Sequence, residues 1–131
     1  MLANKENKHR GSVYLVFEYL EHDMHGILER NITYETSHVK CIMRQLLEGL
    51  AFMHDQCILH RDIKGGNLLM SRDGRLKIAD FGLARVFYPK VDMNYTTRVV
   101  TLWYRAPELL LGISKYGAAI DIWSVGYIFK N

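Results

Sequence analysis

The stretch from His60 to Asn67, HRDIKGGN, combines an acid, a base and an amide at short spacing. Phosphoryl transfer asks a protein mainly for in-line positioning and for positive charge beside the phosphate oxygens. Asp62 can accept or orient the proton of a substrate hydroxyl, and Lys64 can neutralise the moving phosphoryl group. Asn67, together with Asp80 further along the chain, offers the oxygen ligands that magnesium prefers. These residues therefore predict a phosphoryl-transfer loop.

A metal site is the alternative chemistry for the residues just before this loop. His54, Cys57 and His60 are three positions apart, a spacing that suits metal ligation. A structural zinc site needs four ligands, however, and no second cluster supplies the fourth. We favour the interpretation of a helix end beside a buried thiol.

Three helices and one strand are expected around the loop. Apolar residues recur at spacings of three and four from about Thr36 to His54, which predicts the main core helix. Asp23 can cap a shorter helix that runs through Glu29. The mostly apolar stretch 118–129 predicts a third helix, and the β-branched and aromatic residues from Val13 to Tyr19 predict a buried strand.

A small β-hairpin is predicted directly after the loop. Residues 68–70 and 76–78 are apolar and flank a turn that contains an Asp-Gly pair. The hairpin carries Asn67 at one end and Asp80 at the other, so it brings the two candidate magnesium ligands toward one point. Residues 83–105 lack periodicity and predict a long functional loop.

The composition predicts one globular domain. The 131 residues are 49% hydrophobic and 24% charged, which argues against disorder. The net charge of +3 is spread along the chain, so we expect no direct nucleic-acid contact. No apolar run is long enough for a membrane span, and the first residues, MLANKENKHRG, are polar. With only two cysteines, we expect an intracellular protein, nuclear or cytoplasmic.

The order of the motifs resembles that of a known family. The motifs occur in the same order as in eukaryotic protein kinases: the loop, the hairpin, Asp80-Phe81-Gly82, a variable segment and Ala106-Pro107-Glu108. From Val13 to Phe129 the chain is similar to the C-terminal lobe of such a kinase, specifically of the cyclin-dependent kinase family. Residues 95–112, YTTRVVTLWYRAPELLLG, resemble that family's activation segment, and EHDMHGIL at 21–28 resembles its transcription-associated members.

The resemblance implies an α+β fold, mainly helical, with the small hairpin and one residual strand of the N-terminal lobe. It also implies a serine/threonine kinase that uses ATP and Mg²⁺. The residues implied to contact ATP are Phe17 as gatekeeper, Glu18 to Leu20 as hinge, Asp23 at the ribose and Leu69 under the adenine.

Substrate and regulatory residues are implied in the same way. Thr101 would hydrogen-bond near Asp62 and Lys64, and the pocket that favours proline after the target Ser or Thr would be formed by Val99, Val100 and Arg105. Thr96 matches the activating phosphorylation site, where Arg61 could help neutralise a phosphate of nearly two charges. Asp121 and Trp123 match a buried Asp-x-Trp motif of the central helix.

The resemblance covers only part of a kinase domain, which we place at residues 1–131. The sequence contains no Gly-rich GxGxxG loop, no lysine strand of the VAIK type and no helix with the partner glutamate. The helix that contacts cyclin in the family is absent from the sequence as well. Glu108 has no arginine partner of the family's kind, and Lys130-Asn131 depart from the pattern. We therefore expect little activity from this chain alone. The alternative is a non-catalytic kinase lobe that binds or competes as a regulator.

Overall fold

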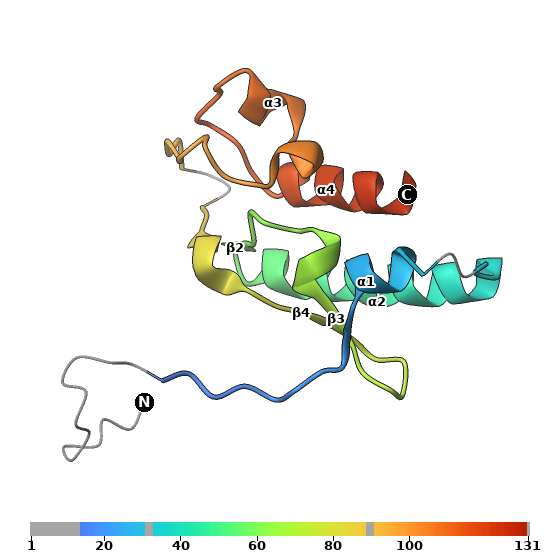
Figure 1. Ribbon diagram of the computed structural model, residues 1–131. Coiled ribbons are helices and arrows are strands. Elements are labelled where there is room, and N and C mark those ends of the chain that lie inside the picture. Colours follow the sequence, from blue (N-terminus) through green and yellow to red (C-terminus); the bar gives the residue numbers. More distant parts are fainter. Residues whose placement is uncertain (1–13, 31–32, 89–90, 131) are drawn as a thin grey trace, which may run out of the picture.

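The computed structural model describes residues 14–30, 33–88 and 91–130. Helix α2 (Thr36–Asp55) lies at the centre of the main core, as its apolar periodicity predicted. Its apolar stripe packs on α1 (Met24–Leu28), on the segment that follows β2 (Ile58–Leu59) and on α4 (Ala119–Lys130). The buried members of this core are Met24, Leu46, Leu50, Met53, Ile63, Leu68 and Val125. The predicted phosphoryl-transfer loop is therefore built directly on the core (Figure 1).

The strands form two small antiparallel sheets. β3 (Leu68–Met70) and β4 (Leu76–Ile78) make the predicted hairpin, and β1 (His22–Asp23) pairs with the other edge of β3. β2 pairs with β5 (Arg85–Val86), which lies inside the stretch predicted to be an irregular loop. A pairing of two residues leaves no periodicity in the sequence, which is why this second sheet was not predicted.

The strand predicted from Val13 to Tyr19 is wrong for the described part of that segment. Residues 14–20 have no regular structure, and Val16 is 95% and Phe17 79% exposed, while Val13 lies outside the described residues. A strand needs a neighbour to take its backbone hydrogen bonds, whatever its side chains prefer. Pairing with β3 includes only His22 and Asp23, and Figure 1 shows the preceding segment running away from the helices.

Helix α4 confirms one buried position of the Asp-x-Trp motif and corrects the other. Asp121 is fully buried, but Trp123 is 52% exposed. Two residues along an α-helix turn the side chain by about 200°, so a helix that points Asp121 at the loop points Trp123 away from it. Ile120 joins a second buried cluster with Val99, Val100, Ala106 and Leu109, the last of these from α3 (Pro107–Leu110). Among the described residues, no helix has the length and apolar character needed to cross a bilayer.

Candidate active site

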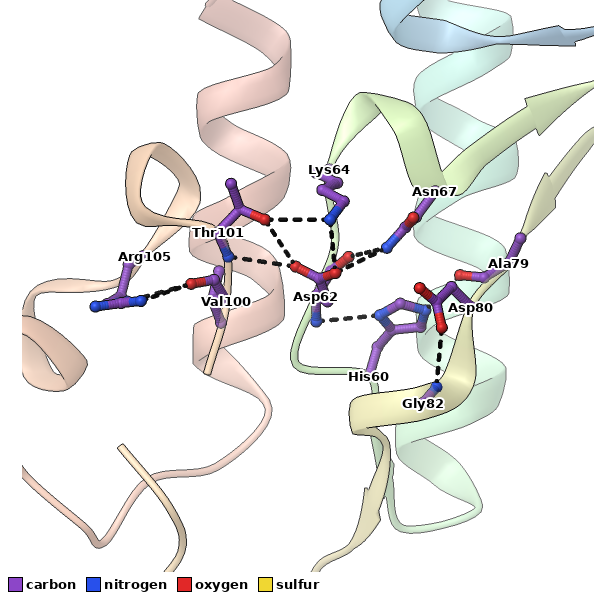
Figure 2. Close-up of polar contacts among 10 residues, drawn as sticks. All are labelled: His60, Asp62, Lys64, Asn67, Ala79, Asp80, Gly82, Val100, Thr101 and Arg105. Carbon is purple, nitrogen blue, oxygen red and sulfur yellow. Dashed lines mark hydrogen bonds and ion pairs between the residues drawn. The ribbon is translucent and has the colours of Figure 1, made fainter. Parts of the chain in front are cut away.

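Asp62 is the centre of a hydrogen-bonded network that joins the loop to the segment around Thr101 (Figure 2). Its Oδ1 accepts from the Thr101 backbone nitrogen at 3.2 Å and from Thr101 Oγ1 at 3.0 Å. Its Oδ2 accepts from Lys64 Nζ at 2.8 Å and from Asn67 Nδ2 at 3.1 Å. Burial raises the pKa of Asp62, but the hydrogen bonds from Lys64 and Thr101 outweigh it, so the pKa is lowered. Asp62 is thus an ionised acceptor at neutral pH.

Lys64 completes this arrangement as a positive charge between the two segments. Its Nζ contacts Thr101 Oγ1 at 3.2 Å as well as Asp62. The contact expected between Thr101 and the pair Asp62 and Lys64 is therefore present. A cation and a carboxylate side by side are the groups that can stabilise a phosphoryl group and orient a hydroxyl.

The hairpin brings Asn67 and Asp80 to the same side of the loop. The Ala79 backbone nitrogen donates to the Asn67 carbonyl at 2.8 Å, which ties the end of β4 to the loop. Asn67 uses its Nδ2 for Asp62, and no hydrogen bond from a described residue reaches its Oδ1. Asp80 has left-handed backbone angles, with φ of 61°, and among the described residues its exposed side chain accepts only from Gly82 N, at 3.2 Å. These oxygens fit a hard cation such as Mg²⁺.

His60 connects Asp62 with the Asp80-Phe81-Gly82 segment. Its Nε2 lies 3.0 Å from the Ala79 carbonyl, and its Nδ1 accepts from the Asp62 backbone nitrogen at 3.2 Å. This pattern requires a neutral ring with the proton on Nε2. Burial lowers the pKa of His60, against the hydrogen bond to Ala79, and so favours the neutral form. The ring also packs on Phe81, with centroids 5.2 Å apart.

Asp121 of α4 fixes the backbone at the start of the loop. Its Oδ2 accepts from the His60 backbone nitrogen at 3.0 Å and pairs with His54 Nε2 at 2.9 Å, while its Oδ1 accepts from the Arg61 backbone nitrogen at 2.9 Å. Arg61 has φ of 69°, a region that costs energy for a side chain with a Cβ. The buried carboxylate therefore stabilises a strained turn immediately before Asp62.

The predicted proline pocket has an unusual backbone. Val99 and Val100 are buried, and Val100 has φ of 64°, which is costly for a β-branched residue. Arg105 holds this conformation, because its Nη2 donates to the Val100 carbonyl at 2.9 Å and its Nε to the Val99 carbonyl at 3.0 Å. The sequence indicated the residues of the pocket but carried no sign of the left-handed angle.

The predicted phosphosite and its arginine are connected through a residue that the sequence analysis missed. Thr96 is exposed, but Arg61 is only 3% exposed and donates from Nε to the Leu83 carbonyl at 2.7 Å. Arg61 Nη1 donates to the Tyr116 hydroxyl at 2.9 Å, and this hydroxyl donates to the Thr96 carbonyl at 2.5 Å. A single tyrosine 55 positions from the arginine gives no local signal in the sequence.

The residues predicted to contact ATP are divided between an exposed segment and the sheet. Phe17 and Glu18 are exposed and Leu20 is half-buried, and Glu18 forms an ion pair with Lys77 of β4. Leu69 is half-buried in β3, directly opposite Asp23 of β1.

The Asp23 carboxylate serves as the N-cap of α1. Its Oδ1 accepts from the Gly26 backbone nitrogen at 2.9 Å, as the prediction of a capped helix required. The role of Asp23 and of the other predicted adenine and ribose contacts stays a prediction.

The alternative metal ligands have other partners. His54 pairs with Asp121 and His60 with Ala79. In the part of the chain that the structure describes, no three His, Cys, Asp or Glu side chains are grouped to hold a metal ion.

Comparison with known proteins identifies the family. A sequence model of the protein kinase domain matches residues 4–131. The chain therefore belongs to the protein kinase family.

Its relatives include cyclin-dependent kinases, which confirms the narrower resemblance. Cyclin-dependent kinase C-2 of Oryza sativa subsp. japonica is 56% identical over 126 residues, which cover 95% of this chain and 25% of the relative. Cyclin-dependent kinase 9 of Danio rerio is 50% identical over 133 residues, covering 98% and 36%. A chain of the yeast RNA Pol II CTD kinase CTDK-1 complex is 46% identical with a TM-score of 0.81, covering 86% of this chain and 37% of that one. The chain thus spans about a quarter of the length of the rice relative.

Proposed function

We propose that this chain carries the phosphoryl-transfer centre of a serine/threonine protein kinase that acts before proline. The observation that carries the proposal is the network at Asp62, whose carboxylate is held by Lys64, Thr101 and Asn67. The substrate hydroxyl would lie against Asp62. The oxygen of the substrate hydroxyl would form a bond to the γ-phosphorus of ATP, while the bond from that phosphorus to the bridging oxygen breaks. The hydroxyl proton passes to Asp62, and ADP leaves.

The remaining residues of the site would position ATP. Asn67 and Asp80 would hold Mg²⁺ through oxygen atoms, and the ion would supply positive charge for the phosphate oxygens. Lys64 would neutralise charge on the phosphoryl group as it moves toward the substrate. The proposed contacts of the nucleoside remain Phe17, Glu18, Leu20, Asp23 and Leu69.

The test compares two Asp→Asn variants of the complete protein with ATP and a Ser-Pro peptide. Asp62→Asn removes the proton acceptor, so turnover should fall about 100-fold or more. Asp55→Asn makes the same change at an exposed position at the end of α2 and should turn over like the wild type. Full activity of Asp62→Asn would refute the proposed role. A complete protein that binds partners but never turns over would favour the regulatory alternative.

Preference for proline would follow from the Val100 carbonyl. Arg105 occupies that carbonyl, so a substrate residue lying against Val100 finds no acceptor for its backbone N–H. An unsatisfied donor costs about 1–3 kcal/mol, and proline has no N–H to leave unsatisfied.

The preference is tested by the ratio of rates for Ser-Pro and Ser-Ala peptides. Arg105→Met removes the donors and frees the Val100 carbonyl, so the ratio should fall by about tenfold. Arg98→Met makes the same change at an exposed neighbouring position and should leave the ratio unchanged. An unchanged ratio in Arg105→Met would contradict the explanation.

Thr96 is the proposed activating phosphosite, and a cyclin is the proposed partner. The exposed Thr96 side chain is accessible to another kinase, and a phosphate there adds close to two negative charges to the segment that Tyr116 links to Arg61. Intact-mass measurement after exposure to an activating kinase should show one added phosphate that Thr96→Ala abolishes. The proposal of a cyclin rests on the names of the relatives, and co-purification of the complete protein with a cyclin subunit tests it.

A further inference from the structure

We propose that Tyr116 is a positioning residue that transmits the phosphorylation state of Thr96 to the catalytic loop. The proposal rests on the kinase function proposed above and adds a residue to which that function gave no part. Its evidence is the placement of one hydroxyl group between two segments that the chain brings together from far apart.

The Tyr116 hydroxyl joins the two segments by using both of its hydrogen-bonding capacities. It donates to the Thr96 carbonyl at 2.5 Å and accepts from Arg61 Nη1 at 2.9 Å. A phenolic hydroxyl has one proton to donate and can accept at the same time, so the two bonds coexist. A phenylalanine in its place would keep the ring and lose both bonds.

On the loop side, a displacement of Arg61 cannot remain local. Its guanidinium is buried and also donates to the Leu83 carbonyl, and its backbone nitrogen donates to Asp121. Its backbone lies in the costly left-handed region, so the surrounding contacts determine its conformation. Because Arg61 directly precedes Asp62, the position of the guanidinium and the orientation of the Asp62 carboxylate are coupled.

On the side of the phosphosite, the backbone is fixed while the Thr96 side chain is exposed. The Tyr95 ring packs on Tyr116 with centroids 5.4 Å apart, and the Tyr95 backbone nitrogen donates to the Ser114 carbonyl at 2.8 Å. The hydrogen bond from the Tyr116 hydroxyl to the Thr96 carbonyl therefore determines where a phosphate on Thr96 lies relative to the guanidinium of Arg61. Without the Tyr116 hydroxyl, the position of the phosphate relative to the catalytic loop would no longer be fixed.

The test measures kcat/KM for the complete protein with Thr96 phosphorylated and unphosphorylated. The ratio of the two values is the activation factor. It should fall about tenfold in Tyr116→Phe, within the range of typical couplings between sites. Tyr95→Phe removes a hydroxyl from the same pair of rings and should keep the wild-type factor, because no described residue hydrogen-bonds to it. If Tyr116 has only a structural role, Tyr116→Phe lowers both forms equally and leaves the factor unchanged, which would overturn the proposal.

A second measurement separates this proposal from the kinase function itself. If the wild type shows no turnover, the proposed function fails, and tryptic cleavage after the exposed Arg98 then tests the link alone. Turnover that does not respond to phosphorylation of Thr96 would overturn the present proposal and leave the kinase function standing. Loss of the bond to the Thr96 carbonyl should make cleavage of Tyr116→Phe about three- to tenfold faster than that of wild type and Tyr95→Phe. Equal cleavage rates in all three proteins would overturn the link.

Discussion

Replacing Asp121 by asparagine should lower the free energy of unfolding by about 1–2 kcal/mol, although the two side chains have nearly the same shape. The buried carboxylate receives three contacts at 2.9–3.0 Å, from the backbone nitrogens of His60 and Arg61 and from His54 Nε2. An amide can place an acceptor oxygen at only one of the two carboxylate positions. Its NH₂ group must therefore face at least one of these donors.

The size of the effect follows from the better of the two orientations. With the oxygen at the Oδ2 position, the bonds to His60 and His54 remain and only the Arg61 N–H loses its acceptor. Losing this one hydrogen bond to a charged group, which leaves the buried Arg61 N–H without a partner, costs about 1.5–3 kcal/mol. Relaxation of the left-handed Arg61 backbone returns about 1 kcal/mol or more, which limits the loss.

Urea unfolding followed by tryptophan fluorescence measures the difference, and Asp80→Asn is the matched control. Asp80 is exposed, and asparagine tolerates its left-handed angles, so that variant should stay within about 0.5 kcal/mol of the wild type while losing phosphoryl transfer. Asp121→Asn should lose stability and activity together. An unfolding free energy equal to that of the wild type would refute the role given to this carboxylate.

Three further predictions concern the loop itself. Burial lowers the pKa of His60 below its ordinary 6.5, so the unfolded chain binds the proton more readily and stability should fall as the pH drops through 6.5; urea titrations should show a smaller loss in His60→Gln. A Cβ at Gly65 would lie 3.1 Å from a backbone nitrogen of α1, whereas one at Gly66 meets nothing within 4 Å, so Gly65→Ala should be about 1 kcal/mol less stable than Gly66→Ala in thermal unfolding, and equal stabilities would contradict the contact. Burial raises and the Lys64 hydrogen bond lowers the pKa of Asp62, so Lys64→Met should move the acid limb of the kcat/KM profile to higher pH.

The elements that the sequence predicted well are those whose cause is local. Helix α2 was evident from its apolar spacing, and the hairpin from its Asp-Gly turn, because both patterns repeat within a few residues. The segment 14–19 shows the limit of such reasoning. Its composition favours a strand, but a strand also depends on a partner elsewhere in the chain.

One short motif was enough to predict the chemistry of the candidate site. The acid, the lysine and the amide lie within one short motif, so their spacing was readable without any structure. The contacts that hold this motif appear only in the folded chain: Thr101 binds Asp62, Asp121 accepts from the backbone of the loop, and Tyr116 lies between Arg61 and Thr96. These contacts join positions 20 to 60 residues apart, and contacts at such separations leave no repeating pattern in the sequence from which they could be predicted.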